Sequence, residues 1–234
     1  MSGDGDAALF RLGRLSVVDL DALDQPITEL LASPTLDPLH QDPRWLPLVK
    51  RLEVEQTVRE AHYDKALRQA LAVRVNKDQD IRNRLGKDRS NKALLEEITE
   101  IDADNLAWLK QVVDRQGWPT ITQVGPDGAG SFWLLAQHAD SDPAFQERVL
   151  SLMTPLVTQR EALGYQLAYL TDRVRRARDE PQVYGTQLEI VNDRIVPETL
   201  QAPEQVDARR AGVGLGPLNE YISVNEANRH SQES

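Results

Sequence analysis

Residues 91–117, NKALLEEITEIDADNLAWLKQVVDRQG, carry the clearest helical pattern in the chain. From Leu94 to Val112, mostly apolar residues recur at spacings of three and four, so they share one face of a helix. Gly117 is a typical helix stop. A related pattern over residues 53–84, with charged residues on the opposite face, predicts a second long helix. We expect these two helices to pack antiparallel as part of a helical bundle.

Shorter helices are predicted after this pair. The turn residues GPDG at 125–128 precede a short buried helix over residues 131–139. Asp142 and Pro143 then supply the N-cap and first residue of a helix that ends near residue 156. Apolar residues at helical spacing predict another amphipathic helix over residues 161–178.

The C-terminal part changes character because β-branched residues become frequent. In VYGTQLEIVNDRIVPE, residues 183–198, they stand on both sides of Asn192 and Asp193, which tolerate the positive φ of a tight turn. A short helix over residues 203–211 and an extended segment over residues 214–222 are expected to follow. The predicted fold is therefore mostly α, a bundle of antiparallel helices with one small C-terminal β-hairpin.

The sequence divides into three parts. Residues 1–52 are expected to be a loose N-terminus followed by short helices, with prolines at 26, 34, 38, 43 and 47 and with Asp37 and Asp42 as N-caps. Residues 53–222 form the main helical domain. Residues 223–234 are polar at their end and are expected to be a disordered tail.

Composition excludes several classes of function. The 234 residues include no cysteine, which rules out disulfides, thiolate zinc sites and a cysteine nucleophile. The formal net charge of -10 disfavours binding to nucleic acid or to an anionic membrane, and no stretch is apolar enough to span a bilayer. The first residues lack the basic and apolar regions of a signal peptide, so we expect a soluble cytoplasmic protein. The sequence leaves the oligomeric state open.

The stretch SFWLLAQHADSDPAFQ, residues 131–146, is the best candidate for a functional site. Its first helix is apolar nearly all round and is therefore expected to be buried, yet it carries Gln137, His138 and Asp140. Buried polar side chains need hydrogen-bond partners, so other polar residues are expected to gather around this stretch. Because residues 131–146 form a helix, a loop and the start of a second helix in this prediction, we call the stretch the corner.

Two segments later in the chain offer such partners. Tyr169, Asp172 and Arg173 are spaced so that one side of a helix presents a hydroxyl, a carboxylate and a guanidinium together. Tyr184 and Gln187 lie in the segment YGTQ. We expect the pocket to be lined by these residues together with the corner.

The polar cluster has a functional and a structural interpretation. In the functional one, His138 is a general base or acid oriented by Asp140 or Asp172, while Arg173 and Tyr184 bind an anionic or polar substrate. This predicts that His138, Tyr184 and at least one of the two aspartates surround a common cavity. In the structural one, the same side chains cap helices and satisfy one another.

Metal and cofactor chemistry is not expected. The four histidines, at 40, 62, 138 and 230, do not form a metal-binding spacing such as H-x-H or H-x-x-E-H. The sequence also lacks a G-x-S-x-G turn, and its Gly-x-Gly near residue 214 does not follow a strand. We therefore predict no bound metal and no cofactor.

Several stretches together resemble a bacterial family known only as a domain of unknown function. They are DQDIR (78–82), DNLAWLKQVVDRQGWPT (104–120), VGPDGAGSFWLLAQHADSDPAFQ (124–146), LAYLTDRV (167–174), QVYGTQ (182–187) and VDARRAGVGLGPLNEY (206–221). The resemblance covers residues 75–221 and implies a mostly helical fold but no particular activity. It marks as recurring polar positions Gln137, His138, Asp140, Tyr169, Asp172, Arg173, Tyr184 and Gln187. Ser141 stands where members often carry a second histidine, which weakens a mechanism that needs two.

Three classes of function follow from these observations. We expect the chain to bind a small polar molecule or a peptide in a pocket around His138. The alternative is a cofactor-independent acid–base enzyme, a hydrolase, lyase or cyclase, with His138, Asp140 and Asp172 as its catalytic residues. The third is a protein-interaction module, in which the proline-rich N-terminal helices bind a partner and the polar cluster is structural.

Overall fold

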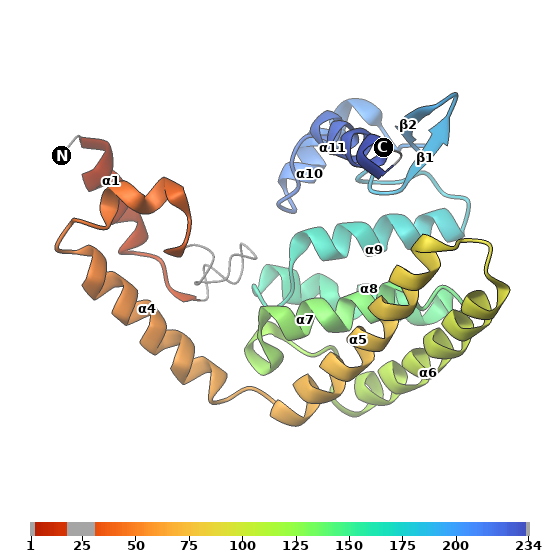
Figure 1. The fold of residues 1–234 in the computed structure, drawn as a ribbon, viewed down its shortest axis with the longest axis horizontal. Helices are drawn as coiled ribbons and strands as arrows, with labels where there is room; N and C mark the ends of the chain where they lie inside the picture. Colours follow the sequence, from red (N-terminus) through yellow and green to blue (C-terminus); the bar gives the residue numbers. More distant parts are fainter. Residues whose placement is uncertain (1–2, 18–30, 233–234) are drawn as a thin grey trace.

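The computed structural model describes residues 3–17 and 31–232. Its elements are mostly helices, with a two-stranded antiparallel sheet near the C-terminus (Figure 1). The predicted fold class, a mostly α bundle with a small C-terminal β-hairpin, is confirmed. The predicted proline punctuation at Pro26 lies outside the described residues.

The N-terminal elements have a small hydrophobic core of their own. They are α1 (Gly3–Leu12), the 3-10 helix η1 (Pro34–Leu39) and α4 (Trp45–Glu60), and they lie to one side of the other helices (Figure 1). Their core is formed by Leu9, Val17, Leu39, Leu48 and Leu52. Part of the N-terminus that was expected to be loose is therefore helical.

The predicted helix over residues 53–84 was wrong as a single element. The structure ends α4 at Glu60 and begins α5 (Lys65–Lys87) after a short turn. The reason is an N-cap inside the apolar pattern: the side chain of Asp64 accepts a hydrogen bond from the backbone N–H of Leu67 at 2.9 Å. The backbone N–H of Asp64 donates to the carbonyl of Gln123 at 2.8 Å, which ties this turn to α7 (Ile121–Gln137).

Helix α6 (Lys92–Gln116) confirms the pattern on which the fold prediction rested. Asn91 caps its N-terminus by accepting from the N–H of Leu94, and Gly117 ends it with a φ of 77°, a conformation that favours glycine. Helix α5 packs against both α6 and α7. These three helices form the frame of the candidate site described below.

Helix α7 (Ile121–Gln137) begins earlier than predicted. Thr120 and Gln123 form a capping box, so the helix starts before the GPDG segment. Gly125, with a φ of 75°, interrupts the helix with a kink where the sequence predicted a turn. A side chain at this position would also meet Arg68 and Tyr63 at less than 3.0 Å.

Helix α8 (Pro143–Thr158) starts where the sequence predicted. The carboxylate of Asp142 accepts from the N–H of Phe145 at 3.0 Å, and Pro143 is the first helical residue. Helix α9 (Gly164–Ala177) packs against α8 and α7.

The hairpin and the last short helix are also confirmed. Strands β1 (Leu188–Val191) and β2 (Arg194–Pro197) pair antiparallel, and both residues of the turn, Asn192 and Asp193, have positive φ. The 3-10 helix η2 (Pro203–Gln205) and α10 (Val206–Ala211) follow.

The C-terminal segment differs from the prediction. Residues expected to be extended, and most of those expected to form a disordered tail, belong to α11 (Leu218–Gln232). Side chains distant in sequence anchor this helix: Asp207 accepts from the N–H of Leu218 at 2.8 Å, and the hydroxyl of Tyr221 donates to the carbonyl of Thr186 at 3.1 Å. Such long-range contacts leave no local pattern in a polar segment.

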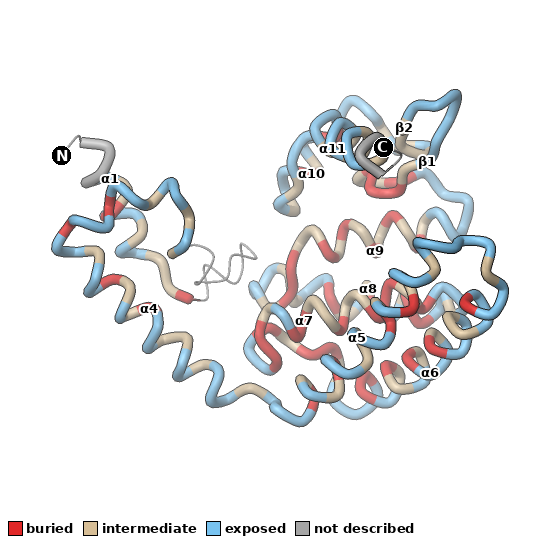
Figure 2. The backbone as a smooth tube through the Cα atoms, viewed as in Figure 1, coloured by how far each residue is buried: buried red, intermediate tan, exposed pale blue. Residues whose placement is uncertain are grey.

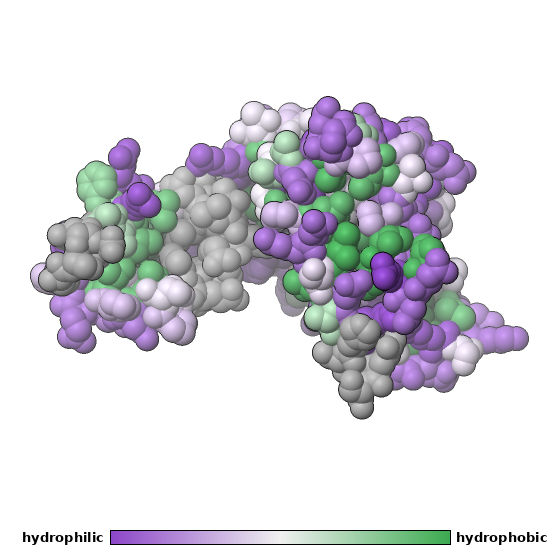
Figure 3. Space-filling model, turned by 90° about the horizontal axis from the view of Figure 1, so that it is seen from above, coloured by the Kyte–Doolittle hydropathy of each residue, from purple (hydrophilic) through white to green (hydrophobic). Residues whose placement is uncertain are grey.

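The main hydrophobic core lies between α5, α6, α7, α8 and α9 (Figure 2). Among its fully buried members are Leu109, Val124, Phe132, Val149 and Leu170. The surface seen from above is mostly hydrophilic, with apolar side chains gathered in the middle of the main body (Figure 3). Among the described residues, every helix is too short or too polar to cross a membrane.

Candidate functional site

His138 lies at the C-terminal end of α7, where it is the C-cap residue. Its Nδ1 atom is 2.9 Å from Oδ1 of Asp78, which α5 contributes from the neighbouring side of the bundle. The imidazole is half-buried, with 17% of its side chain exposed, whereas the side chain of Asp78 is completely buried. Asp140 or Asp172 was predicted to orient His138, whereas in the structure the carboxylate that contacts the ring is that of Asp78.

The carboxylate of Asp78 is held by donors on both oxygens. Oδ1 accepts from His138 and from Nε of Arg82 at 3.1 Å, and Oδ2 accepts from the side-chain amide of Gln79 at 2.7 Å. Burial by itself raises the pKa of Asp78, but the hydrogen bond and charge of His138, with Gln79 and Arg82, outweigh it and lower the pKa. An ionised carboxylate only accepts hydrogen bonds, so Nδ1 of His138 is protonated and donates to Asp78.

Arg82 joins this pair to a second carboxylate. Its NH2 group donates to Asp102 of α6, while its Nε donates to Asp78. Burial raises the pKa of Asp102 and outweighs the opposing effect of the guanidinium. The result is a chain of hydrogen-bonded side chains, His138–Asp78–Arg82–Asp102, that connects α7, α5 and α6.

The same side chains have the chemistry of metal ligands. Potential ligand atoms of Asp78, Asp102 and His138 lie within 4.8 Å of one another. However, the guanidinium of Arg82 makes ion pairs with both carboxylates and thereby supplies the positive charge that a cation would bring. Both carboxylates therefore already have a positively charged partner within the protein, and the absence of a bound metal stays a prediction.

Asp140 forms a different ion pair, two residues after His138. Arg173 of α9 binds its carboxylate with two parallel hydrogen bonds, from Nε at 2.7 Å and from NH2 at 2.6 Å. The side chain of Asp140 is 57% exposed. Burial raises the pKa of Asp140. Arg173, Gln146 and the charge of His138 lower it by more, so the net shift is downward.

Gln146 fixes the corner from the inside. Its buried side-chain amide, on α8, donates to the carbonyls of Ala136 and Gln137 at 3.2 Å each and lies 3.3 Å from a carboxylate oxygen of Asp140. Carbonyls in the last turn of a helix lack partners within the helix, so Gln146 satisfies the end of α7. Gln146 therefore ties the first turn of α8 to the end of α7 next to His138.

Asp172 anchors the YGTQ segment. Its buried carboxylate accepts from the backbone N–H groups of Val183, Tyr184 and Thr186 and from the hydroxyl of Thr186, at 2.8 to 3.2 Å. The carboxylate of this predicted catalytic residue is therefore used as a hydrogen-bond acceptor by a loop of the same chain.

Three other predicted ligand-binding residues lie in α9 and in the YGTQ segment: Tyr169, Tyr184 and Gln187. The rings of Tyr169 and Trp133 meet edge to face with centroids 6.3 Å apart, and Tyr169 meets Tyr221 in the same way. Burial raises the pKa of Tyr169 and of Tyr184. The backbone N–H of Gln187 donates to the side chain of the buried Gln182 at 2.7 Å.

The structure thus brings some predicted site residues together and leaves others apart. His138, Asp140 and Arg173 belong to the corner, and the buried Gln137 contributes a carbonyl to it. The predicted cavity around His138 and Tyr184 stays a prediction.

Sequence reasoning missed Asp78, Arg82 and Asp102. A signal for Asp78 exists, because it is on the buried face of α5 in helical register with Leu71 and Ile81. A carboxylate in register with buried leucines needs partners, and DQDIR is also one of the stretches that carry the family resemblance. Asp102 has no such signal in its own helix.

The fold and this corner define a class: a helical-bundle protein with a partly buried polar network that includes a histidine. The chain belongs to the family of unknown function DUF6624, which it matches over residues 65–230. The matched region contains α5, α6 and α7, the three helices that contribute the network, and it does not contain α1 or α4. Searches of curated proteins and of solved structures found no match.

Proposed function

We propose that the chain binds a small polar molecule or a peptide beside the imidazole of His138. The observation that carries this proposal is the hydrogen bond between Nδ1 of His138 and the fully buried Asp78. Because Nδ1 donates to Asp78, the lone pair of a neutral imidazole is on Nε2, where it accepts a hydrogen bond from a ligand.

The neighbouring charges favour a polar ligand. Arg173 and Asp140 form an ion pair at the same corner, and the exposed carboxylate of Asp140 has further acceptor capacity for ligand N–H or O–H groups. Gln146 holds the last turn of α7 through the carbonyl of Ala136, and Asp78 holds the imidazole of His138. A preorganised group loses little entropy when a ligand binds, which supports recognition at this place.

The second candidate is a cofactor-independent acid–base enzyme. It is favoured by the same contact, because a carboxylate that holds one imidazole nitrogen stabilises the imidazolium formed when the other nitrogen takes a proton. In this candidate His138 is the catalytic base or acid and Asp78 is its positioning residue. Asp140, predicted from the sequence as catalytic, would then contact the substrate.

Ligand-observed NMR tests the binding proposal. The protein is screened against a set of amino acids, dipeptides, small carboxylic acids and sugars. We expect at least one compound to bind the native chain and to lose binding in His138→Gln, which keeps a polar side chain but lacks the imidazole.

His62→Gln is the matched control. His62 is exposed in the turn after α4, and its Nδ1 contacts the carbonyl of Val58 in that helix. Binding that survives in the control and disappears in His138→Gln, at an unchanged melting temperature, supports the site. Compounds that bind both variants equally, or no binding by any compound of the set, overturn it.

Turnover separates the two candidates. Chromogenic esters, amides and glycosides are assayed with the native chain, His138→Gln and Asp78→Asn. The enzyme candidate requires activity that disappears in His138→Gln and falls in Asp78→Asn in the fraction of molecules that remains folded. Binding without conversion of any bound compound excludes it for those reactions.

A further inference from the structure

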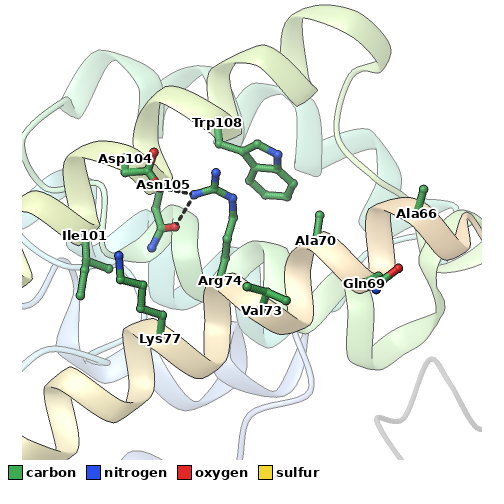
Figure 4. Close-up of a pocket in the computed structure, with 10 residues that line it drawn as sticks. All are labelled: Ala66, Gln69, Ala70, Val73, Arg74, Lys77, Ile101, Asp104, Asn105 and Trp108. Atoms are coloured by element: carbon green, nitrogen blue, oxygen red, sulfur yellow. Dashed lines mark hydrogen bonds and ion pairs between the residues drawn. The ribbon is translucent and has the colours of Figure 1, made fainter.

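A pocket between α5 and α6 is lined by none of the side chains of the His138 network. It has a volume of about 580 Å³ and lies between the two helices (Figure 4). Ala70, Val73, Ile101 and Trp108 give it a mostly apolar wall, and Val73 is 66% exposed although it is apolar. The pocket therefore offers contact area to an apolar group.

Asn105 is a buried amide with an unused donor in this pocket. The residue is only 4% exposed, and its Oδ1 accepts from NH1 of Arg74 at 3.0 Å. A guanidinium only donates, so this contact fixes which end of the amide is oxygen. Among the residues that the structure describes, Nδ2 of Asn105 has no hydrogen-bond partner.

A buried N–H donor without an acceptor is costly, and folded proteins rarely keep one. An acceptor supplied by a ligand removes this cost. The unused amide donor therefore points to a ligand that presents an oxygen acceptor to the pocket.

Lys77 adds a positive charge at the same end. In the view of Figure 4, its ammonium and the amide nitrogen of Asn105 lie at one end of the pocket, away from Ala66 and Gln69. Within the described part of the chain, Lys77 has no carboxylate within ion-pair distance. Its charge is therefore available to a ligand.

The other charges of the pocket neutralise each other. Arg74 pairs with Asp104 at 2.7 Å and lies over the ring of Trp108, with its guanidinium carbon 4.8 Å from the ring centroid. The charged side chains that line the pocket are Arg74, Lys77 and Asp104, which leaves one net positive charge.

We infer that this pocket binds a small monocarboxylate with an apolar body. The carboxylate would accept from Nδ2 of Asn105 and pair with Lys77, and the apolar part would cover Val73 and Trp108. A single negative charge matches the net charge of the lining. A phosphate dianion would lose more hydration energy on entering a mostly apolar wall.

This inference is independent of the function proposed above, because none of the residues that line the pocket belongs to the His138 network. Loss of one site therefore leaves the other measurable.

Titration by NMR with phenylacetate, hexanoate and indole-3-acetate tests the inference. We expect at least one of them to shift the side-chain amide signal of Asn105 in a saturable way. The matching neutral amides, such as 2-phenylacetamide, should bind at least about tenfold more weakly, because they lack the charge that pairs with Lys77.

Two variants of equal charge change provide the comparison. Lys77→Gln should weaken carboxylate binding by about tenfold, and Lys87→Gln, an exposed position on the same helix outside the pocket, by less than about twofold. Asn105→Asp keeps the acceptor for Arg74 but replaces the donor by a carboxylate oxygen, so it should abolish binding.

Some outcomes would overturn the inference. If none of the three carboxylates shifts the Asn105 signal, the pocket does not take this class of ligand. Equal affinity for a carboxylate and its neutral amide, or equal effects of Lys77→Gln and Lys87→Gln, would show that the charge is not recognised. Thermal melts confirm that each variant is folded.

Discussion

Nδ1 of His138 lies 2.9 Å from Oδ1 of Asp78, although 60 positions separate the two residues in the chain. The contact joins the end of α7 to the middle of α5 and orients a half-buried imidazole by a completely buried carboxylate. It is consequently both a structural link within the bundle and the feature that makes His138 chemically distinctive.

The first prediction concerns Asp78→Asn. The variant keeps the size of the side chain but removes the charge that satisfies His138 and Arg82, so the free energy of unfolding should fall by about 3 kcal/mol at neutral pH. Chemical denaturation measures this change. Asp80→Asn, an exposed neighbour with the same charge change, should stay within about 0.5 kcal/mol of the native chain.

The effect of Asp78→Asn should depend on pH. The pKa of Asp78 is lowered in the folded state, so its ionised form stabilises the fold above the unfolded pKa of about 3.9. This contribution is lost as the pH falls through the folded pKa. The difference in stability between the native chain and the variant should therefore narrow below about pH 4. A constant difference across that range would contradict the role of the charge.

Much of the fold could be predicted because its signals are local. Asn91 and Gly117 delimit α6, Asp142 with Pro143 starts α8, and Asn192-Asp193 forms the hairpin turn. Caps and turns act within a few residues, so the sequence displays them directly. The break before α5 escaped because the apolar pattern continues across it, and the cap of Asp64 was not recognised.

The site could be predicted only in part because its contacts are long-range. His138 and Asp140 are conspicuous since they interrupt an apolar helix, whereas Asp102 sits in a helix with many charged residues. Which carboxylate orients His138 depends on how α5, α6 and α7 pack. A pattern within one helix does not contain that information, although the register of Asp78 with Leu71 marks it as buried.

The second prediction concerns Asp172→Asn. An amide has one acceptor oxygen where the carboxylate has two, so the variant loses part of the hydrogen bonding to Val183, Tyr184 and Thr186. We expect stability to fall by about 3 kcal/mol, because hydrogen bonds to a buried charge are strong. Hydrogen exchange should speed up at these three amides.

Asp179→Asn is the control for the loop. Asp179 is exposed at the end of α9, and asparagine tolerates its φ of 57°. Exchange at residues 183–186 should be unchanged in this variant. Equal protection of these residues in both variants would show that Asp172 does not hold the loop.

The third prediction concerns the pair formed by Asp140 and Arg173. The pair has good geometry, but Asp140 is 57% exposed, so solvent screens the attraction. A double-mutant cycle with Asp140→Asn and Arg173→Met should give a coupling free energy below about 1 kcal/mol. A coupling above about 2 kcal/mol would mean that the pair is a main stabilising contact of the corner.

The fourth prediction is that Arg82 excludes metal from the network. Elemental analysis of the purified native chain should find no stoichiometric metal, and added Zn²⁺ or Mn²⁺ should leave its melting temperature unchanged. The reason is that the guanidinium already pairs with the carboxylates of both Asp78 and Asp102. Tightly held metal in the native protein would contradict this account.

Arg82→Met tests the same idea from the opposite direction. The substitution removes the positive charge between the two carboxylates. The potential ligand atoms of Asp78, Asp102 and His138, which lie within 4.8 Å of one another, remain. The variant should be less stable than the native chain, and Zn²⁺ at about 100 times its dissociation constant should restore about 2.7 kcal/mol. Arg84→Met, at an exposed arginine of the same helix that pairs with Asp80 and Glu97, should show no such response. If Zn²⁺ stabilises both variants equally, or neither, the guanidinium is not what keeps a cation out of this network.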